Sequence, residues 1–230
     1  MPMTPLICIS SMATRQLLAT LCTQWAASGG QPVALESVGG VDAARRIDAG
    51  DTCDVVVLAS DALDKLLVTG RIGTPEAMAQ SQVAIAAAPG TNFQIETLAQ
   101  LCASLANARS IGFSTGPSGK ALLEWFERLG ILASLRDRLV QAPPGTPVGN
   151  LIAQGVVEIG FQQCSELIHC KGIDLLGPLP PGSEITTVFS AAVCRTARET
   201  VAAAQFIAFL RSSAAFDAIR QEGMAPAGLL

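Results

Sequence analysis

Apolar and polar positions alternate along the first third of the chain in a way that predicts strands and helices in turn. The apolar run at 6–10 ("LICIS") predicts a buried strand, "PVALES" at 32–37 predicts a second strand, and the continuous apolar run at 53–60 ("CDVVVLAS") predicts a strand covered on both faces. Apolar residues then recur at helical spacing after each run, with Asp61 expected to cap the third helix and Gly70 to end it. This βαβαβα order favours a right-handed parallel sheet covered by helices on both faces.

A second set of elements follows the first. Strands are expected at 81–90, 110–114, 156–162, 172–177 and 185–194, and helices at about 95–107, after 116, 147–155, 163–170, 197–212 and 213–222. The long strands near 82–88 and 185–194 are expected to connect two halves. We therefore expect an α/β chain with lobe 1 formed by 1–82 plus 190–230 and an inserted lobe 2 at 83–189.

Composition narrows the function classes. Hydrophobic residues make up 50% of the 230 and charged residues 15%, which excludes a disordered chain. A net charge of -4 without a basic block argues against nucleic acid as a partner. No apolar run reaches the ~18 residues of a membrane span, and the start "MPMTPLICISS" lacks the pattern of a leader peptide. The sequence thus predicts a cytoplasmic protein, or a periplasmic one if a leader has been trimmed away.

Seven cysteines are an odd number, and most lie inside apolar runs. No pair or Cys/His cluster has the spacing of metal ligands, so neither a metal site nor a cofactor is expected. The sequence instead predicts reduced thiols in a reducing compartment.

Small hydroxyl residues and glycines gather where the expected strands end and the next helices begin. Ligands of open α/β sheets lie at these carboxyl ends, and helix N-termini present N–H groups that hold anions. Any single loop of this kind is also an ordinary helix cap, but several at one cleft predict a site for a small anion. The expected ligand-binding residues are Ser10, Ser11, Met12, Gly39, Gly40, Ser60, Ser114, Ser118, Gly119, Lys120, Pro147, Val148 and Gln162.

The stretch "IGFSTGPSGKALLEWFERLG" at 111–130 looks at first like a phosphate-binding loop. A P-loop needs glycine where this chain has Ser114 and a hydroxyl where it has Ala121, so the nucleotide interpretation fails at two defining positions. The loop suits a carboxylate or oxyanion better. Lys120 is either a charge partner for that anion or a solvated lysine of the first helical turn.

The segments "CDVVVLAS", "DALDKLLVTGRI" and "STGPSG", in this order of elements, resemble the type II periplasmic-binding-protein family, in its molybdate-binding-protein-like branch. The resemblance covers nearly the whole chain. It implies two lobes, each with a mixed or parallel sheet, and a ligand cleft between them. "GTPVGNLIAQGVVEIGFQQ" and the chain's C-terminal end resemble the subgroup that includes aconitate isomerase. Members of the molybdate-binding branch are exported, whereas this sequence shows no export signal.

The subgroup resemblance implies an isomerase that moves a C=C bond of a polycarboxylate by a cofactor-free proton shift. Such a shift needs a base, and Glu36, Glu166 and His169 are the candidates. Each also has a structural interpretation: Glu36 as a surface charge at a strand end, Glu166 as a solvated helix residue and His169 as a residue at a helix C-terminus. The alternative function is a receptor: the solute-binding protein of a transporter for molybdate, another oxyanion or a carboxylate, or a cytosolic sensor on the same fold.

Overall fold

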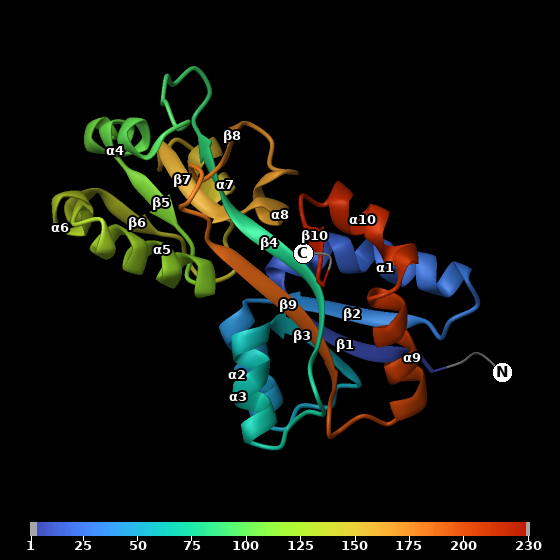
Figure 1. Ribbon diagram of the computed structural model, residues 1–230. Coiled ribbons are helices and arrows are strands. Elements are labelled where there is room, and N and C mark those ends of the chain that lie inside the picture. The colour runs from blue at the N-terminus through green and yellow to red at the C-terminus, as the bar shows by residue number, and fades with distance from the viewer. Residues whose placement is uncertain (1–3, 229–230) are drawn as a thin grey trace. The chain divides into compact units, whose positions relative to one another are not determined.

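The computed structural model describes residues 4–228 and divides them into two compact units (Figure 1). Unit 1 comprises the chain up to Ser81 and from Thr187 onward, and unit 2 is the insertion Gln82–Thr186. The chain enters unit 2 within β4 (Glu76–Ala87) and returns within β9 (Thr186–Val193). The α/β fold class predicted from the sequence is confirmed.

The sheet of unit 1 is built on three parallel strands. β1 (Leu6–Ser11) lies between β2 (Val33–Val38) and β3 (Val55–Ala59), and β9 pairs antiparallel with β3. The short strand β10 (Ala225–Pro226) pairs antiparallel with the first half of β4. Every residue of β3 is buried, as its continuous apolar run requires of a strand covered on both faces.

Helices cover both faces of this sheet. α1 (Arg15–Ala27), α9 (Thr200–Leu210) and α10 (Phe216–Gln221) share one buried core, in which α9 contributes Phe206 and Leu210. The other core is formed with α2 (Gly40–Asp48) and α3 (Ser60–Val68).

The predicted ends of α3 are half right. Its N-cap is Ala59, and Asp61 lies inside the first turn without a capping hydrogen bond, so the expected cap at Asp61 was wrong. The strand β3 runs directly into the helix and leaves no loop residue for a polar cap. The predicted end is confirmed, because Gly70 follows the helix with a φ of +69°, which glycine adopts without strain.

In unit 2, β5 (Ile111–Phe113) lies parallel between β6 (Leu139–Gln141) and β7 (Ile159–Gln163). β7 and β8 (Asp174–Pro178) pair antiparallel with the second half of β4. β4 begins at Glu76, five residues before its expected start.

The helices of unit 2 form two cores. α4 (Leu98–Asn107), α5 (Pro117–Arg128) and α6 (Leu132–Leu135) pack on one, and α7 (Val148–Ala153) and α8 (Cys164–Leu167) on the other. The helix expected over 163–170 is therefore only its first turn. Short 3-10 turns complete the elements at Met12–Thr14, Arg136–Arg138 and Ser213–Ala215.

Candidate functional site

Serine hydroxyls of unit 1 pair with one another at the carboxyl ends of its strands. The parallel register aligns Ser10 with Ser37, and their Oγ atoms are 2.7 Å apart. Ser60, the first residue of α3, has its Oγ 2.7 Å from that of Ser190 on β9. These contacts hold the serine oxygens in place near the carboxyl ends of β1, β2 and β3.

The N-terminus of α2 lies beside Ser11, the last residue of β1. A Cβ built on Gly40 would come 3.7 Å from the Cβ of Ser11, so the first turn of the helix approaches this serine closely. Gly39 is the N-cap, and no side chain of the described chain caps this helix. Met12, half-buried, begins the 3-10 turn that follows Ser11. Unit 1 therefore combines uncapped N–H groups with a hydroxyl, the donors that an anion needs.

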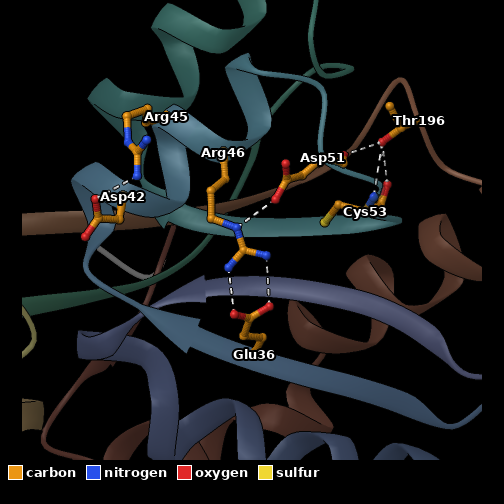
Figure 2. A network of polar contacts seen from close by, with 7 residues as sticks. All are labelled: Glu36, Asp42, Arg45, Arg46, Asp51, Cys53 and Thr196. Carbon is orange, nitrogen blue, oxygen red and sulfur yellow. Dashed lines mark hydrogen bonds and ion pairs between the residues drawn. The ribbon is translucent and has the colours of Figure 1, made fainter.

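Glu36 is held in an ion pair rather than left available (Figure 2). Its two carboxylate oxygens accept from Arg46 Nη1 at 2.6 Å and Nη2 at 3.0 Å, and Arg46 Nε donates to Asp51 Oδ2 at 2.8 Å. The hydrogen bonds from Arg46 hold the pKa of Glu36 below its ordinary value. The side chain is half exposed, so Glu36 is an ionised link between β2 and α2 and a weak proton acceptor.

The first turn of α5 in unit 2 packs directly onto the end of β5. Ser114 and Ser118 are buried, and their Oγ atoms lie 3.0 Å apart. A Cβ on Gly119 would lie 1.8 Å from the carbonyl oxygen of Ser114, so glycine is required there. Gly116 is the N-cap and offers no side chain. Lys120, by contrast, is exposed, with its Nζ 3.7 Å from Glu124 one turn along the helix.

Glu166 is at the end of a chain of hydrogen bonds that begins at α7. Val148 N donates to Gln162 Oε1 at 2.7 Å, and Gln162 Nε2 donates to Glu166 Oε1 at 2.7 Å. Pro147 is the N-cap of α7 and immediately precedes Val148. Burial raises the pKa of Glu166 to about 7, although the hydrogen bond from Gln162 opposes this shift. His169 follows α8 with an exposed side chain.

The parallel pairing of β5 with β7 brings the two groups of unit 2 to one edge. Phe113 is aligned with Phe161, so the residues that follow them, Ser114 and Gln162, lie side by side at a strand spacing of about 4.8 Å. The predicted residues Ser114, Ser118, Gly119, Val148, Gln162 and Glu166 therefore share the carboxyl edge of these strands.

One polar residue at this edge escaped the sequence analysis. Ser165, beside Glu166, is 6% exposed, and its Oγ has no hydrogen-bond partner within residues 4–228. A buried hydroxyl without a partner is costly, so it marks a position where a ligand oxygen or a water would be stabilised. A serine between the buried residues Gln163 and Leu167 is the signal that sequence reading had available.

Neither a metal-binding cluster nor a membrane-spanning helix occurs within residues 4–228. Within the described ranges, no group of three or more His, Cys, Asp or Glu side chains is arranged to hold a metal ion. All seven cysteines lie in this part of the chain and are free thiols. No helix between residues 4 and 228 is long and apolar enough to cross a bilayer.

Comparisons with known proteins agree with this architecture. The family model described as "Bacterial extracellular solute-binding protein" matches residues 6–225. An aconitate isomerase from Pseudomonas sp is 30% identical over 185 residues, which cover 79% of this chain and 70% of that protein.

Solved structures show the same fold at lower sequence identity. The periplasmic molybdate-binding protein of Azotobacter vinelandii superposes with a TM-score of 0.81 at 21% identity, covering 96% of this chain and 98% of that one. A sulfate-binding protein of Mycobacterium tuberculosis H37Rv gives a TM-score of 0.82 at 17% identity, covering 98% and 88%. The two-lobe periplasmic-binding-protein fold expected from the sequence is thereby confirmed.

Proposed function

The chain belongs to the bacterial extracellular solute-binding protein family, and from this premise we propose that it binds a small carboxylate anion and shifts a proton within it. Two features support the proposal that the ligand is an anion. The 12-residue helix α5 begins without a side-chain cap, next to the Ser114–Ser118 hydroxyl pair. In unit 1, α2 begins in the same way beside Ser11. Uncapped N–H groups and hydroxyls stabilise a carboxylate by charge-assisted hydrogen bonds.

The observation that carries the catalytic part of the proposal is Glu166. A carboxyl whose pKa is about 7 is present in both protonation states near neutral pH, so it can take a proton from carbon and return it. Glu36 lacks this property because Arg46 keeps it ionised. The 30% identity to an aconitate isomerase supports the same choice of chemistry.

The proposed step is a redox-neutral 1,3-proton shift. Glu166 removes a proton from a carbon next to the C=C bond of an unsaturated polycarboxylate, and the electron pair spreads over the allylic carbons and a carboxylate. The N–H groups at the start of α5 and the serine hydroxyls stabilise this developing charge. The protonated Glu166 then delivers its proton to the far allylic carbon, which moves the double bond and restores the carboxylate.

Isotope exchange tests the proposal. The protein is incubated with cis- or trans-aconitate in deuterium oxide, and NMR follows isomer formation and deuterium at the reprotonated carbon. We expect Glu166→Gln to lower turnover by about a hundred-fold or more with little change in binding, because the base acts in the transition state. Glu36→Gln is the matched control and keeps most of the turnover. Tight binding of these acids by the wild-type protein, without formation of the other isomer, would contradict the isomerase.

A second candidate function is that of a receptor that binds its anion unchanged. The fold shared with molybdate- and sulfate-binding proteins favours it, because hydroxyls and helix N-termini hold tetrahedral oxyanions as well as carboxylates. Calorimetry with molybdate, sulfate and aconitate distinguishes the receptor from the isomerase. Binding of an inorganic oxyanion in preference to every carboxylate, without turnover of any of them, would establish the receptor.

A further inference from the structure

Both ends of the Gln162 side-chain amide are used inside unit 2. Its Oε1 accepts from Val148 N and its Nε2 donates to Glu166 Oε1, each at 2.7 Å, and the residue is 3% exposed. The two partners also determine which way the amide faces. A backbone N–H can only donate, and an ionised carboxylate can only accept, so the flipped amide would lose both hydrogen bonds.

We propose that Gln162 is a positioning residue, which holds the Glu166 carboxyl in place and keeps its ionised form accessible, rather than a residue that binds the ligand. This inference rests on the proposed function insofar as Glu166 is the base. It also gives the backbone of α7 a role. Val148 N holds Gln162, and Gln162 in turn holds Glu166, so the first residue of α7 acts on the carboxyl through one side chain.

The hydrogen bond from Gln162 is the contact that lowers the pKa of Glu166 against the effect of burial, because the elements packed around Glu166 supply no positive charge. α7 ("VGNLIA") and β7 ("IGFQQ"), which pack against α8, carry no ionisable side chain. Cys164 is the first residue of α8. Cys170, which follows this helix, donates from its Sγ to the backbone oxygen of Glu166 at 3.1 Å. His169 and Lys171 follow with exposed side chains. Burial raises the pKa of Glu166, and the donor from Gln162 lowers it.

A direct titration of Glu166 tests the inference without any substrate. The protein is labelled with glutamate carrying ¹³C at the side-chain carboxyl, and the Glu166 signal is assigned by its loss in Glu166→Gln. In Gln162→Met, which has a similar shape but no donor, we expect the midpoint of this signal to rise by about one pH unit. Gln154→Met is the matched control, because Gln154 is exposed at the far end of α7, and it should titrate like the wild type.

A second variant breaks the chain of contacts without touching Gln162. Val148→Pro removes the N–H that holds the amide. Proline suits this first helical position, and the extended backbone of Pro147 (φ -63°, ψ 140°) suits a residue that precedes proline. We expect its midpoint to rise as well. A wild-type midpoint in a folded Gln162→Met or Val148→Pro protein would overturn the inference.

The two proposals fail separately. If aconitate is never isomerised but both midpoints rise, the hydrogen-bond relay stands and the isomerase does not. If aconitate is isomerised but the midpoints stay at the wild-type value, Glu166 remains the base and Gln162 loses its role.

Discussion

Glu166 makes folding dependent on pH in the opposite sense to an ion-paired carboxylate. Its pKa rises from an ordinary value of 4.5 to about 7 in the folded protein, so the folded state binds the proton more tightly than the unfolded state. The stability linked to this group is full below pH 4.5 and is lost as pH rises through 7. At neutral pH, the ionised part of the wild-type population holds a carboxylate in a site that stabilises the protonated form better than water does.

Replacement of this carboxyl by an amide removes the penalty. Glu166→Gln keeps an oxygen for the donor Nε2 of Gln162 and has no charge to bury. We expect its gain in unfolding free energy over the wild type to be about 2 kcal/mol larger at pH 8 than at pH 5. Urea denaturation at the two pH values measures this difference. A gain that is the same at both pH values would show that Glu166 has an ordinary pKa.

The hydroxyl pair at the start of α5 leads to a prediction about affinity. If Ser118 binds a ligand oxygen, Ser118→Ala should make the binding free energy of the anion less favourable by about 1 to 2 kcal/mol. This is the scale of one hydrogen bond to a charged group. Titration calorimetry measures the change. Ser134→Ala is the control, since Ser134 is an exposed serine of unit 2 whose Oγ donates to the backbone oxygen of Ile131. Equal affinity in both variants would remove Ser118 from the site.

At the scale of residues, the sequence indicated positions better than roles. It placed Ser114, Gln162 and Glu166 near strand ends, because strand ends follow from local apolar patterns. It ranked Glu36 equally with Glu166, because the two hydrogen bonds from Arg46, ten residues further on, form only when α2 packs beside β2. The partners of Gln162 were invisible for the same reason. These roles depend on tertiary contacts that no local pattern encodes.

At the scale of elements, the docking of α5 depends on one missing methyl group. Because a Cβ on Gly119 would overlap the carbonyl oxygen of Ser114, Gly119→Ala must push the first turn of the helix away from β5. We expect a loss of at least about 2 kcal/mol of unfolding free energy. Chemical denaturation measures it.

Gly116→Ala is the matched control for that substitution. A Cβ there meets nothing within 4 Å, and the backbone at φ -79° accepts alanine. A small effect at Gly116 with a large one at Gly119 identifies close packing as the cause. Similar losses in the two variants would point instead to the flexibility of the loop.

The elements that the sequence missed are the short ones. β6 and α6 have three and four residues, and β10 has two, so none is long enough for an apolar period to appear. The early part of β4 was missed because "EAMAQ" includes charged and polar residues. It pairs there with β10, which comes from the far end of the chain.

At the scale of the whole molecule, the fold was predictable because the order of elements and the resemblance to binding proteins agree. The cellular location was not predictable in this way, because the residues that form a buried core are the same in exported and cytoplasmic proteins. The cytoplasmic location therefore stays a prediction, which fractionation of the source cells checks.

The nesting of the two units gives a prediction about fragments. The cores of unit 2 are drawn entirely from residues inside 82–186, and its ends meet where Val83 N donates to Ile185 O at 2.9 Å. We expect 82–186 to fold cooperatively when expressed alone, as followed by circular dichroism during heating. In a fragment 1–186, residues 1–81 should exchange their amide protons rapidly, because Phe206 and Leu210 are missing from their core. A disordered 82–186 fragment would contradict this.

The same nesting sets the order of events on the ribosome. Unit 2 is complete when residue 186 has emerged, whereas the first core of unit 1 still lacks β9, α9 and α10. At a synthesis rate of about 5 to 20 residues per second, residues 187–230 take about 2 to 9 seconds to be made. Throughout that interval the apolar residues of β1, β3 and α1 lack the part of their core that β9, α9 and α10 supply. We therefore expect the nascent chain to expose apolar surface that chaperones can bind and that the folded protein buries.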